Sequence, residues 1–538
     1  MSSEGTATTP DVSVIIPVYN TMPYLTACLE SLVGQSIGQD RLEIIAVDDG
    51  STDGSGEELD RFAASYPHVV TVLHQENSGG PAMPCNRGLD QARGRYVFFI
   101  GADDFLAERA LEKMVDSADA WGSDVIWGKV EGVGGRGISQ LMFGQTEKDI
   151  PFPHSKLVFA LANSKMFRRS LIEDHKIRYG LDLRVGSDQP FTVEAMLHAR
   201  RISVLADETY YYGVRRENAS NITFSSSWKA RLEDIGTVMG HIAELVPPGE
   251  DRDQILHRHF LWELNRRLER DLAELPEEAQ REMCGLVAGL ADRYYTDGID
   301  RRLRPAARVR IRCARDGRLD LLQQLTLPVL EEHPPPLALR PSGPVLALPG
   351  FGELPEQLFA FPHVPPPRRF RDVVGAVTAA WRGSVLELEA PAALHPSSAP
   401  QVHVDLVPVR KGVGIRPFKQ VPANVERAHS WPVELAPDPA DERVGSLLRA
   451  RVDVGELIDA PAGPHRRWAL RFRLVAGDRA YDLPVTGAEP SSVQVRRGRT
   501  FHRLVLGTGR ERRLYVMREP VPTIVGVKAA ARRRLGRG

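Results

Sequence analysis

Short apolar runs alternate with amphipathic runs in the first part of the chain. Four of them are rich in valine and isoleucine without strict polar alternation, as strands covered on both faces are: Val12–Pro17, Leu42–Val47, Val69–Leu73 and Tyr96–Ile100. A helix is predicted to start near Pro23, with an apolar stripe formed by Leu25, Cys28, Leu29 and Leu32. The next helix opens with Ser55 and Glu58 in capping-box spacing. This alternation predicts an α/β domain with a mostly parallel, Rossmann-like sheet and helices on both faces.

The pattern changes twice further along. From about Trp228 to Leu325 it is helical, with an apolar residue at every fourth position in Leu256, Phe260, Leu264, Leu268 and Leu272. Prolines then accumulate, as in a stiff connector. Beyond about Arg371 the period becomes two, which is typical of half-buried antiparallel strands. Such strands are predicted around Leu386–Ala390, Val402–Leu406 and Trp468–Leu474.

These shifts divide the chain into six predicted parts. After a polar tail come an α/β domain, a small helical linker module, a proline-rich connector, an antiparallel β-sandwich-like region and a basic tail. Their predicted bounds are 1–10, 11–225, 226–330, 331–370, 371–520 and 521–538.

Composition excludes several classes of protein. The chain has 538 residues, of which 42% are hydrophobic and 26% charged, so it is neither largely disordered nor collagen-like. Its 69 basic and 70 acidic residues give a net charge of -1 and no reason to expect a nucleic-acid partner. The four cysteines are far apart and form no CxxC pair, which argues against a zinc ribbon or a disulfide framework and fits a reducing compartment.

Membrane and targeting signals are sparse. No apolar run approaches the roughly 20 residues of a spanning helix, and the polar N-terminus does not resemble a signal peptide. The basic run Val527–Arg537 is expected to be a solvated tail, with contact to anionic lipid as the alternative. A cytoplasmic protein, at the inner face of the membrane if the tail binds lipid, is therefore expected.

Two familiar motifs occur in the wrong setting. Gly132–Gly137 matches GxGxxG, but no helix or acidic ribose ligand is predicted after it, so we interpret it as a loop. Gly34–Gly38 matches GxSxG, but a nucleophile elbow needs a strand before the serine and a helix after it. Here the order is reversed, and Ser36 is expected in a loop that ends a helix.

Acidic residues follow two of the predicted strands. Asp48, Asp49 and Asp53 come after the second strand, and Asp103 and Asp104 come after the fourth. Ligands of open parallel sheets bind beyond the carboxyl ends of the strands. Crowded carboxylates there need a cation or hydrogen-bond donors, and oxygen ligands suit Mg²⁺ or Mn²⁺. Asp-rich turns without a ligand are the structural alternative.

Four runs together resemble the inverting family-2 glycosyltransferases of the GT-A fold. They are Val14–Asn20 (VIIPVYN), Val47–Asp53 (VDDGSTD), Asp103-Asp104 and Val185–Phe191 (VGSDQPF). The resemblance covers roughly residues 11–225. The spacing after Asn77 is most similar to that of bacterial wall teichoic acid glycosyltransferases, which also carry a helical linker and C-terminal β-domains.

The resemblance implies a role for each matching residue. Asp188 corresponds to the catalytic base and Asp103 to the metal-binding position of the DxD motif, with Mn²⁺ or Mg²⁺ as the implied cofactor. Asp49 corresponds to the residue that hydrogen-bonds the uracil. Further nucleotide and diphosphate contacts are implied for Pro17, Tyr19, Asn77, Arg87, Ala102, Arg215, Arg216 and Ser220. The last three lie where a mobile loop closes over the diphosphate.

The implied reaction is sugar transfer from a nucleoside-diphosphate sugar, expected to be a UDP-sugar, to a hydroxyl of a cell-envelope polymer such as teichoic acid or polysaccharide. A metal ion stabilises the leaving diphosphate, the base deprotonates the acceptor, and attack from the opposite face inverts the anomeric centre. Asp188 as a helix cap is the structural alternative to its role as the base.

Three positions depart from the family pattern, and they leave other functions open. Gly101 replaces the first Asp of DxD, Cys85 replaces an Arg that meets the donor, with Arg87 as its substitute, and Ser187 replaces the Glu before the base. A degenerate transferase that binds a nucleotide-sugar or glycan without turnover is therefore one alternative. A scaffold that forms homo-oligomers through the β-region is another.

Overall fold

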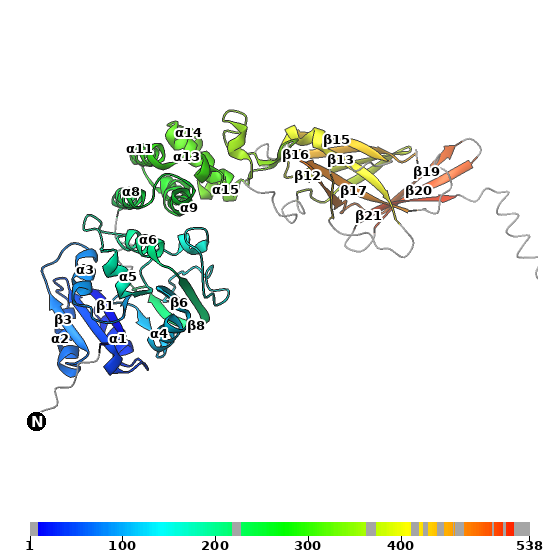
Figure 1. Cartoon of the computed structure of the whole chain (residues 1–538). Coiled ribbons are helices and arrows are strands. Elements are labelled where there is room, and N and C mark those ends of the chain that lie inside the picture. Colours follow the sequence, from blue (N-terminus) through cyan, green and yellow to red (C-terminus); the bar gives the residue numbers. More distant parts are fainter. Residues whose placement is uncertain are drawn as a thin grey trace, which may run out of the picture. The chain divides into compact units, whose positions relative to one another are not determined.

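The computed structural model describes residues 9–217, 227–361, 373–409, 419–422, 429–437, 446–455, 457, 467–497, 500–508 and 513–520. The chain forms two compact units: Met1–Asp271 with Leu275–Arg302, and Leu272–Glu274 with Leu303–Gly538. Figure 1 draws the elements of both units in sequence colours. The helices expected in 226–330 fall in both units, and the six-part division of the chain stays a prediction.

The first unit contains an eight-stranded sheet in the order β3-β2-β1-β4-β7-β6-β8-β5. Its strands are β1 (Val12–Val18), β2 (Leu42–Asp48), β3 (Val70–His74), β4 (Tyr96–Phe99), β5 (Phe105–Leu106), β6 (Val125–Val133), β7 (Met166–Arg168) and β8 (Ile202–Val214). β1 pairs in parallel with β2 and β4, whereas β7 runs antiparallel to β4 and β6. β1 and β2 are almost completely buried. The Rossmann-like sheet is therefore confirmed, and it is parallel at β1–β4 and mixed beyond.

Helices surround this sheet (Figure 1). They are α1 (Tyr24–Val33), α2 (Ser55–Ser65), α3 (Ala82–Gln91), α4 (Ala110–Trp121), α5 (Arg169–Asp174) and α6 (Asp188–His198), with short 3₁₀ turns η1 (Gln39–Arg41) and η2 (Lys156–Phe159). The predicted stripe of α1 is buried, but Pro23 lies at the N-cap rather than in the first turn. No α-helix directly follows the glycines Gly132–Gly137, so the GxGxxG match is not a dinucleotide-binding motif. Ser36 lies between α1 and β2, so the GxSxG match is not a nucleophile elbow.

The predicted capping box of α2 is wrong. Gly54 is the N-cap and Ser55 is already the first helical residue. Asp53 Oδ1 accepts hydrogen bonds from the backbone nitrogen and the hydroxyl of Ser55, at 3.1 and 2.6 Å. Glu58 instead binds Thr26, with 2.6 Å between Oε1 and Oγ1. A carboxylate two residues earlier caps the helix, because the short Asp side chain reaches the first free N–H groups.

Gly88 allows α3 to pack directly on β1. A Cβ atom at Gly88 would lie 2.5 Å from Cγ2 of Ile15, which is completely buried. We expect Gly88→Ala to destabilise the first unit by about 1–3 kcal/mol, because a well-packed core resists an added methyl group. A lower thermal unfolding midpoint would show this.

Gly285→Ala is the matched control for that prediction. Gly285 also lies inside a helix, and a Cβ there would meet nothing within 4 Å. This variant should be stabilised by up to about 1 kcal/mol, since alanine is the better helix former. Equal unfolding midpoints for the two variants would contradict the close packing of α3 on β1.

The predicted helical stretch is confirmed. It contains α8 (Trp228–Leu245), α9 (Glu250–Arg258), a π-helical turn η3 (His259–Leu264), α10 (Asn265–Glu269), η4 (Asp271–Glu274), α11 (Glu277–Tyr294), α12 (Asp297–Asp300), α13 (Pro305–Arg315), α14 (Leu319–Gln324) and α15 (Leu327–Glu332). All five residues of the predicted four-residue repeat are fully buried. A repeat of four drifts by about 40° per step on an α-helix of 3.6 residues per turn. The wider π-helical turn His259–Leu264 offsets part of this drift.

The second unit ends in an antiparallel β-region, as predicted. A short hairpin, β9 (Leu337–Arg340) and β10 (Gly343–Leu346), is followed by the 3₁₀ turn η5 (Glu356–Phe359). An eleven-stranded sheet follows among the described residues: β11 (Thr378–Arg382), β12 (Val385–Ala392), β13 (Val402–Pro408), β14 (Lys419–Pro422), β15 (Ser430–Pro437), β16 (Ser446–Asp453), β17 (Arg467–Ala476), β18 (Arg479–Pro484), β19 (Ser491–Arg497), β20 (Thr500–Thr508) and β21 (Leu514–Pro520), with the 3₁₀ turn η7 (Pro396–Gln401) before β13.

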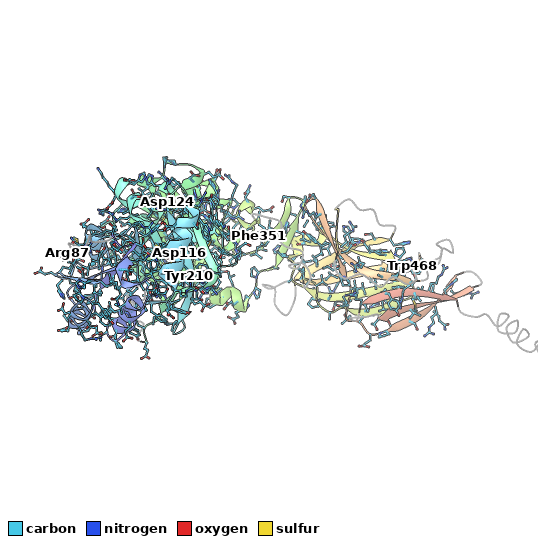
Figure 2. The ribbon with its side chains drawn as sticks, turned by 60° about the horizontal axis from the view of Figure 1, so that its bottom comes forward. Arg87, Asp116, Asp124, Tyr210, Phe351 and Trp468 are labelled. Carbon is cyan, nitrogen blue, oxygen red and sulfur yellow. The ribbon has the colours of Figure 1, made fainter. Side chains whose placement is uncertain are left out.

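This sheet curls around one core. Its two end strands, β11 and β19, meet where Trp381 Nε1 donates to Ser491 Oγ at 3.2 Å. Inward side chains from both halves form one buried cluster, which includes Trp468 (labelled in Figure 2). The period of two predicts that the polar residues of β13 and β17 face solvent. This is partly wrong, because Asp405 and Arg471 are buried. Asp405 is neutralised by Arg473, with 3.0 Å between Oδ2 and Nε.

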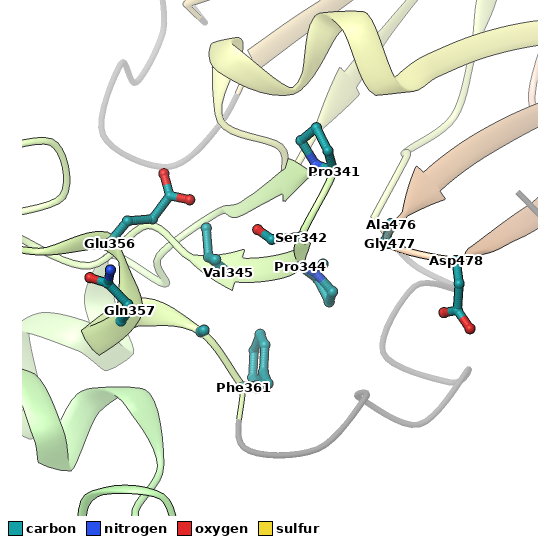
Figure 3. Close-up of a pocket in the computed structure, with 12 residues that line it drawn as sticks. Pro341, Ser342, Pro344, Val345, Glu356, Gln357, Phe361, Ala476, Gly477 and Asp478 are labelled. Atoms are coloured by element: carbon teal, nitrogen blue, oxygen red, sulfur yellow. The ribbon is translucent and has the colours of Figure 1, made fainter. Parts of the chain in front are cut away.

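A cavity of about 700 Å³ in the second unit opens beside the β9–β10 hairpin (Figure 3). None of the site residues implied by the sequence lines it. In the part of the chain that the structure describes, we find no helix that is long and apolar enough to cross a bilayer.

Candidate active site

The ends of β1 and β2 bring the first group of predicted residues together. Pro17 pairs with Val47 in the parallel register, and the Asp49 N–H donates to Val18 O at 2.8 Å. Tyr19, directly after β1, is 49% exposed. An exposed aromatic ring beside a buried carboxylate provides both a flat apolar surface and a hydrogen-bond acceptor, which a nucleotide base needs.

Asp49 anchors the loop that follows β3. Its carboxylate accepts hydrogen bonds from Gln75 Nε2 and from both the backbone nitrogen and the hydroxyl of Ser78, each of the last two at 3.0 Å. Asn77 lies in this loop with an exposed side chain. Gly50 has a φ of 76°, and a Cβ there would lie 2.9 Å from Asn77 N, so the loop can approach only a glycine. Pro17, Tyr19, Asp49 and Asn77 therefore share one end of the sheet.

The two aspartates after β4 have different surroundings. Asp104 is buried, and its carboxylate accepts hydrogen bonds from Arg136 Nη1 at 3.0 Å, Val214 N at 2.7 Å and Tyr211 Oη. Burial raises the pKa of Asp104, and the Arg136 charge opposes the rise. Asp104 thus ties the β4 end to β8. Arg136 lies in the glycine-rich loop after β6, and the sequence did not indicate that it would bind Asp104.

Asp103 forms an ion pair with Arg216, a residue that the sequence predicts to contact the diphosphate. Arg216 Nε donates to Asp103 Oδ2 at 2.8 Å, and the two side chains are only 16% and 12% exposed. Arg216 Nη1 also donates to Asn20 O at 3.2 Å. The segment after β8 therefore lies over the loop after β1. Arg215 is exposed next to it, and Ser220 lies outside the described residues.

Gly101 leaves room for both carboxylates after β4. A Cβ at Gly101 would lie 3.0 Å from Asp104 Oδ2 and 3.1 Å from Asp103 Oδ1. The glycine N–H donates to Tyr211 Oη at 3.3 Å. A larger residue would therefore require both carboxylates to shift by a few tenths of an ångström. Ala102 is buried, with 5% of its surface exposed, so its side chain offers little contact to a ligand.

Helix α3 contacts both the loop that Asp49 anchors and the residues around Asp188. Arg87 (labelled in Figure 2) donates from Nη1 to His74 O at 2.9 Å and to Gln75 Oε1 at 3.2 Å, and Gln75 in turn binds Asp49. Two residues earlier, Cys85 is buried, and burial raises the pKa of its thiol, with the Asp188 charge adding to the rise. One helix thus touches the nucleotide loop and the surroundings of Asp188.

Asp188 is the first residue of α6 rather than its cap, because Ser187 is the N-cap. Burial raises the pKa of the Asp188 carboxyl above its usual range, and the charges of Lys165 and Arg258 oppose the rise. The backbone N–H of Asn163 also stabilises its ionised form. A carboxylate that is partly buried and lies near two cations is suited to accept a proton.

Lys165 is one of these cations, and its position was not predicted. Its side chain is completely buried, and Nζ donates to Ala160 O at 2.7 Å and to Ala162 O. The ammonium lies 4.4 Å from the ring centroid of Trp127. Burial lowers the pKa of Lys165 to about 7, and Asp188 opposes the change. Nothing in the local sequence marks this lysine as buried.

A hollow of about 410 Å³ lies between the two groups. It is lined by Ser78–Gly80, Ala82 and Met83 after β3 and by Leu181–Arg184 before α6. Asn86 holds these segments together, since its side chain exchanges two hydrogen bonds of 2.9 Å with the backbone of Tyr179. The Asp49 loop and the segment leading to Asp188 therefore border one cavity.

Comparison with known proteins assigns the family. Residues 13–175 match the family model described as "Glycosyl transferase family 2". The glycosyltransferase GlyG of Streptococcus pneumoniae is 30% identical over 247 residues, which cover 42% of this chain and 77% of that protein. This chain belongs to glycosyltransferase family 2. Residues 231–326 match a second model, the "Glycosyl transferase TarS linker domain".

Two relatives with longer chains are named for poly(ribitol-phosphate). The poly(ribitol-phosphate) beta-glucosyltransferase of Bacillus spizizenii is 39% identical over 206 residues, covering 38% of this chain and 32% of its own. The poly(ribitol-phosphate) beta-N-acetylglucosaminyltransferase TarS of Staphylococcus aureus is 36% identical over 256 residues, covering 46% and 44%. The matches therefore span less than half the length of either relative.

Solved structures extend the likeness to the fold of the whole chain. The crystal structure of S. aureus TarS covers 96% of this chain and 86% of its own, with a TM-score of 0.57 and 21% identity. A TarS 1-349 structure in complex with UDP-GlcNAc covers 63% of this chain and 97% of its own, with a TM-score of 0.55 and 26% identity. The GT-A domain, the helical linker region and the antiparallel β-region are thus shared with TarS.

Proposed function

We propose that this protein transfers a sugar from a UDP-sugar to a hydroxyl of a polyol-phosphate polymer, with inversion at the anomeric carbon. The observation that carries the proposal is the position of α3. Through Arg87 it supports the Asp49 loop, and through Cys85 it contacts the surroundings of Asp188. A nucleotide-binding end and a partly buried base therefore adjoin, as a transferase needs. The relatives named for poly(ribitol-phosphate) support the class of acceptor.

The nucleotide end binds the donor in this proposal. Tyr19 packs against the base, and Asp49 accepts a hydrogen bond from it while Gln75 and Ser78 hold the carboxylate. Arg215 and Arg216 supply guanidinium donors for the diphosphate, where bidentate contacts are strongest. Arg216 must leave Asp103 to do so, because the same guanidinium now pairs with that carboxylate.

A divalent cation fits beside Asp103. No three His, Cys, Asp or Glu side chains of the described residues lie together as a ready-made metal site. Mg²⁺ sites that also use substrate phosphates need only one or two carboxylates, however, and Asp103 already holds a cationic group. Asp103 would hold Mn²⁺ or Mg²⁺ together with the donor. When bound, the ion stabilises negative charge on the leaving diphosphate.

Asp188 acts as the general base. Its carboxylate accepts the proton of the acceptor hydroxyl as that oxygen attacks the anomeric carbon. Lys165 and Arg258 keep the carboxylate ionised in spite of burial. Attack opposite the leaving diphosphate inverts the anomeric centre.

The proposal also covers the β-region and the basic C-terminal segment, in less detail. The β-region contacts the acceptor polymer or forms homo-oligomers. The basic segment 521–538 lies outside the described residues, and contact with anionic lipid at the inner face of the membrane stays the alternative to a solvated tail.

A transfer assay tests the proposed function. Full-length protein is incubated with UDP-glucose or UDP-GlcNAc, Mn²⁺ and poly(ribitol phosphate), and both free UDP and polymer-bound sugar are measured. We expect release of UDP only in proportion to sugar transferred, with a β-linkage by NMR from the α-configured donor. Donor binding without either product would overturn the proposal in favour of the binding protein suggested by Gly101, Cys85 and Ser187.

A further inference from the structure

The helical module reaches the residue next to Asp188. Arg258, the last residue of α9, donates from Nη1 to Gln189 Oε1 at 2.9 Å. His259, the first residue of the π-helical turn, has its Nε2 3.1 Å from the same oxygen. Consecutive residues of a regular α-helix point about 100° apart. The two side chains nevertheless converge on one atom at the point where the helix changes from α to π.

These contacts are buried. Arg258 is 9% exposed and His259 is completely buried. Arg258 Nη1 lies 3.4 Å from Glu263 Oε1, and its guanidinium lies 5.7 Å from the ring centroid of Trp262. A buried guanidinium is costly unless it is compensated by charge and hydrogen bonds. Burial lowers the pKa of Arg258, and the charges of both Glu263 and Asp188 oppose the change.

We propose that Arg258 is a positioning residue for sugar transfer, which orients the first turn of α6 through Gln189 and supplies positive charge to Asp188 from the helical module. This inference rests on the proposed function, in which Asp188 is the base. It gives the helical module a part in the reaction, because the transferase domain alone would lack one of the two cations around its base.

Several other groups also interact electrostatically with the Asp188 carboxylate, and a test of Arg258 must take them into account. Lys165 faces it from the segment before β7, Cys85 from α3 and Tyr179 from the segment after α5. Burial raises the pKa of both Cys85 and Tyr179, so these groups are neutral near pH 7. Lys165 and Arg258 are therefore the cations that favour the ionised base. Glu263 and His259 interact electrostatically with Arg258 itself.

The pH dependence of kcat separates a charge effect from simple damage to the structure. A base works only when it is deprotonated, so kcat falls as the pH drops through its pKa. Arg258→Gln keeps an N–H donor for Gln189 but removes the charge. The base then holds its proton more strongly, and we expect the acidic limb of the kcat profile to move up by about one pH unit. KM for the donor should stay unchanged.

Three further variants complete the experiment in the full-length protein. Arg258→Lys should restore the wild-type limb because it keeps the charge. Glu263→Gln removes the carboxylate beside Arg258 and should move the limb to lower pH, which decides the question if Arg258→Gln does not fold. Arg267→Met is the matched control: Arg267 also has an 11% exposed side chain, but its ion pair is with Asp271. It should leave the limb in place.

Two outcomes would overturn the inference. The first is an unchanged limb in Arg258→Gln with kcat lowered equally at every pH, as expected of a purely structural residue. The second is a limb that does not move in Glu263→Gln. Failure of the proposed function would look different: the wild type would transfer no sugar, or Asp188→Asn would transfer it as fast as the wild type.

Discussion

Asp188→Asn is expected to lower kcat for sugar transfer by about 100- to 10,000-fold, the range that a general base contributes. Asparagine keeps the size of the side chain but cannot accept the proton of the acceptor hydroxyl. The proposed donor contacts, such as Tyr19 and Asp49, follow β1 and β2 and do not include Asp188, so the affinity for a UDP-sugar should stay the same. Measuring kcat by transfer and donor affinity by calorimetry tests both parts of this expectation.

Glu194→Gln is the matched control for Asp188→Asn. Glu194 lies on the same helix, and burial also raises the pKa of its carboxyl, but its charge interacts with His175 rather than with the site. Its amide variant should keep wild-type kcat. Comparable losses in both variants would show that a buried carboxylate of α6 matters only for packing.

Asp103→Asn is expected to lower kcat by about 100-fold or more, because a cation on the leaving diphosphate is worth several kcal/mol. The loss should be accompanied by loss of Mn²⁺-dependent donor binding, which can be measured as thermal stabilisation by UDP with and without Mn²⁺. Removal of metal from the wild type by a chelator should produce the same state, and added Mn²⁺ should reverse it. The variant should not respond to Mn²⁺.

Asp119→Asn is the control for the ion pair itself. Asp119 binds Arg95 at 2.9 Å and the hydroxyl of Tyr96, at the opposite end of β4 from Asp103. Losing this pair should leave the Mn²⁺ response intact. If UDP stabilises wild type and Asp103→Asn equally in the presence of Mn²⁺, Asp103 is a partner of Arg216 and not a metal ligand.

Local sequence patterns predicted which strands and helices form better than they predicted where these elements begin and end. The apolar runs gave β1 to β4, and the repeat of four gave a buried helical stretch that includes a π-helical turn. The capping box of α2 failed because Ser55 is already helical and donates its N–H and hydroxyl to Asp53, so it does not act as the cap. Two carboxylates or hydroxyls within reach of one helix end cannot be ranked from spacing alone.

The candidate site was predicted only in its local parts. Residues directly after a strand, such as Asp49 and Asp103, lie at the sheet edge because strand direction fixes where they emerge. Lys165 and Arg258 were not predicted as neighbours of Asp188. A buried lysine looks like a surface lysine in the sequence, and a contact with a helix some 70 residues away depends on how the elements pack.

The sequence by itself determined the succession of an α/β, a helical and an antiparallel β-region, the strands β1 to β4, and the acidic residues at the ends of β2 and β4, since periodicity and chain direction are local properties. Tertiary structure decided the pairing of Asp103 with Arg216, the cations around Asp188, and the closure of the β-region through Trp381 and Ser491. These features depend on the packing of segments far apart in the chain, where burial sets the strength of each charge and hydrogen bond.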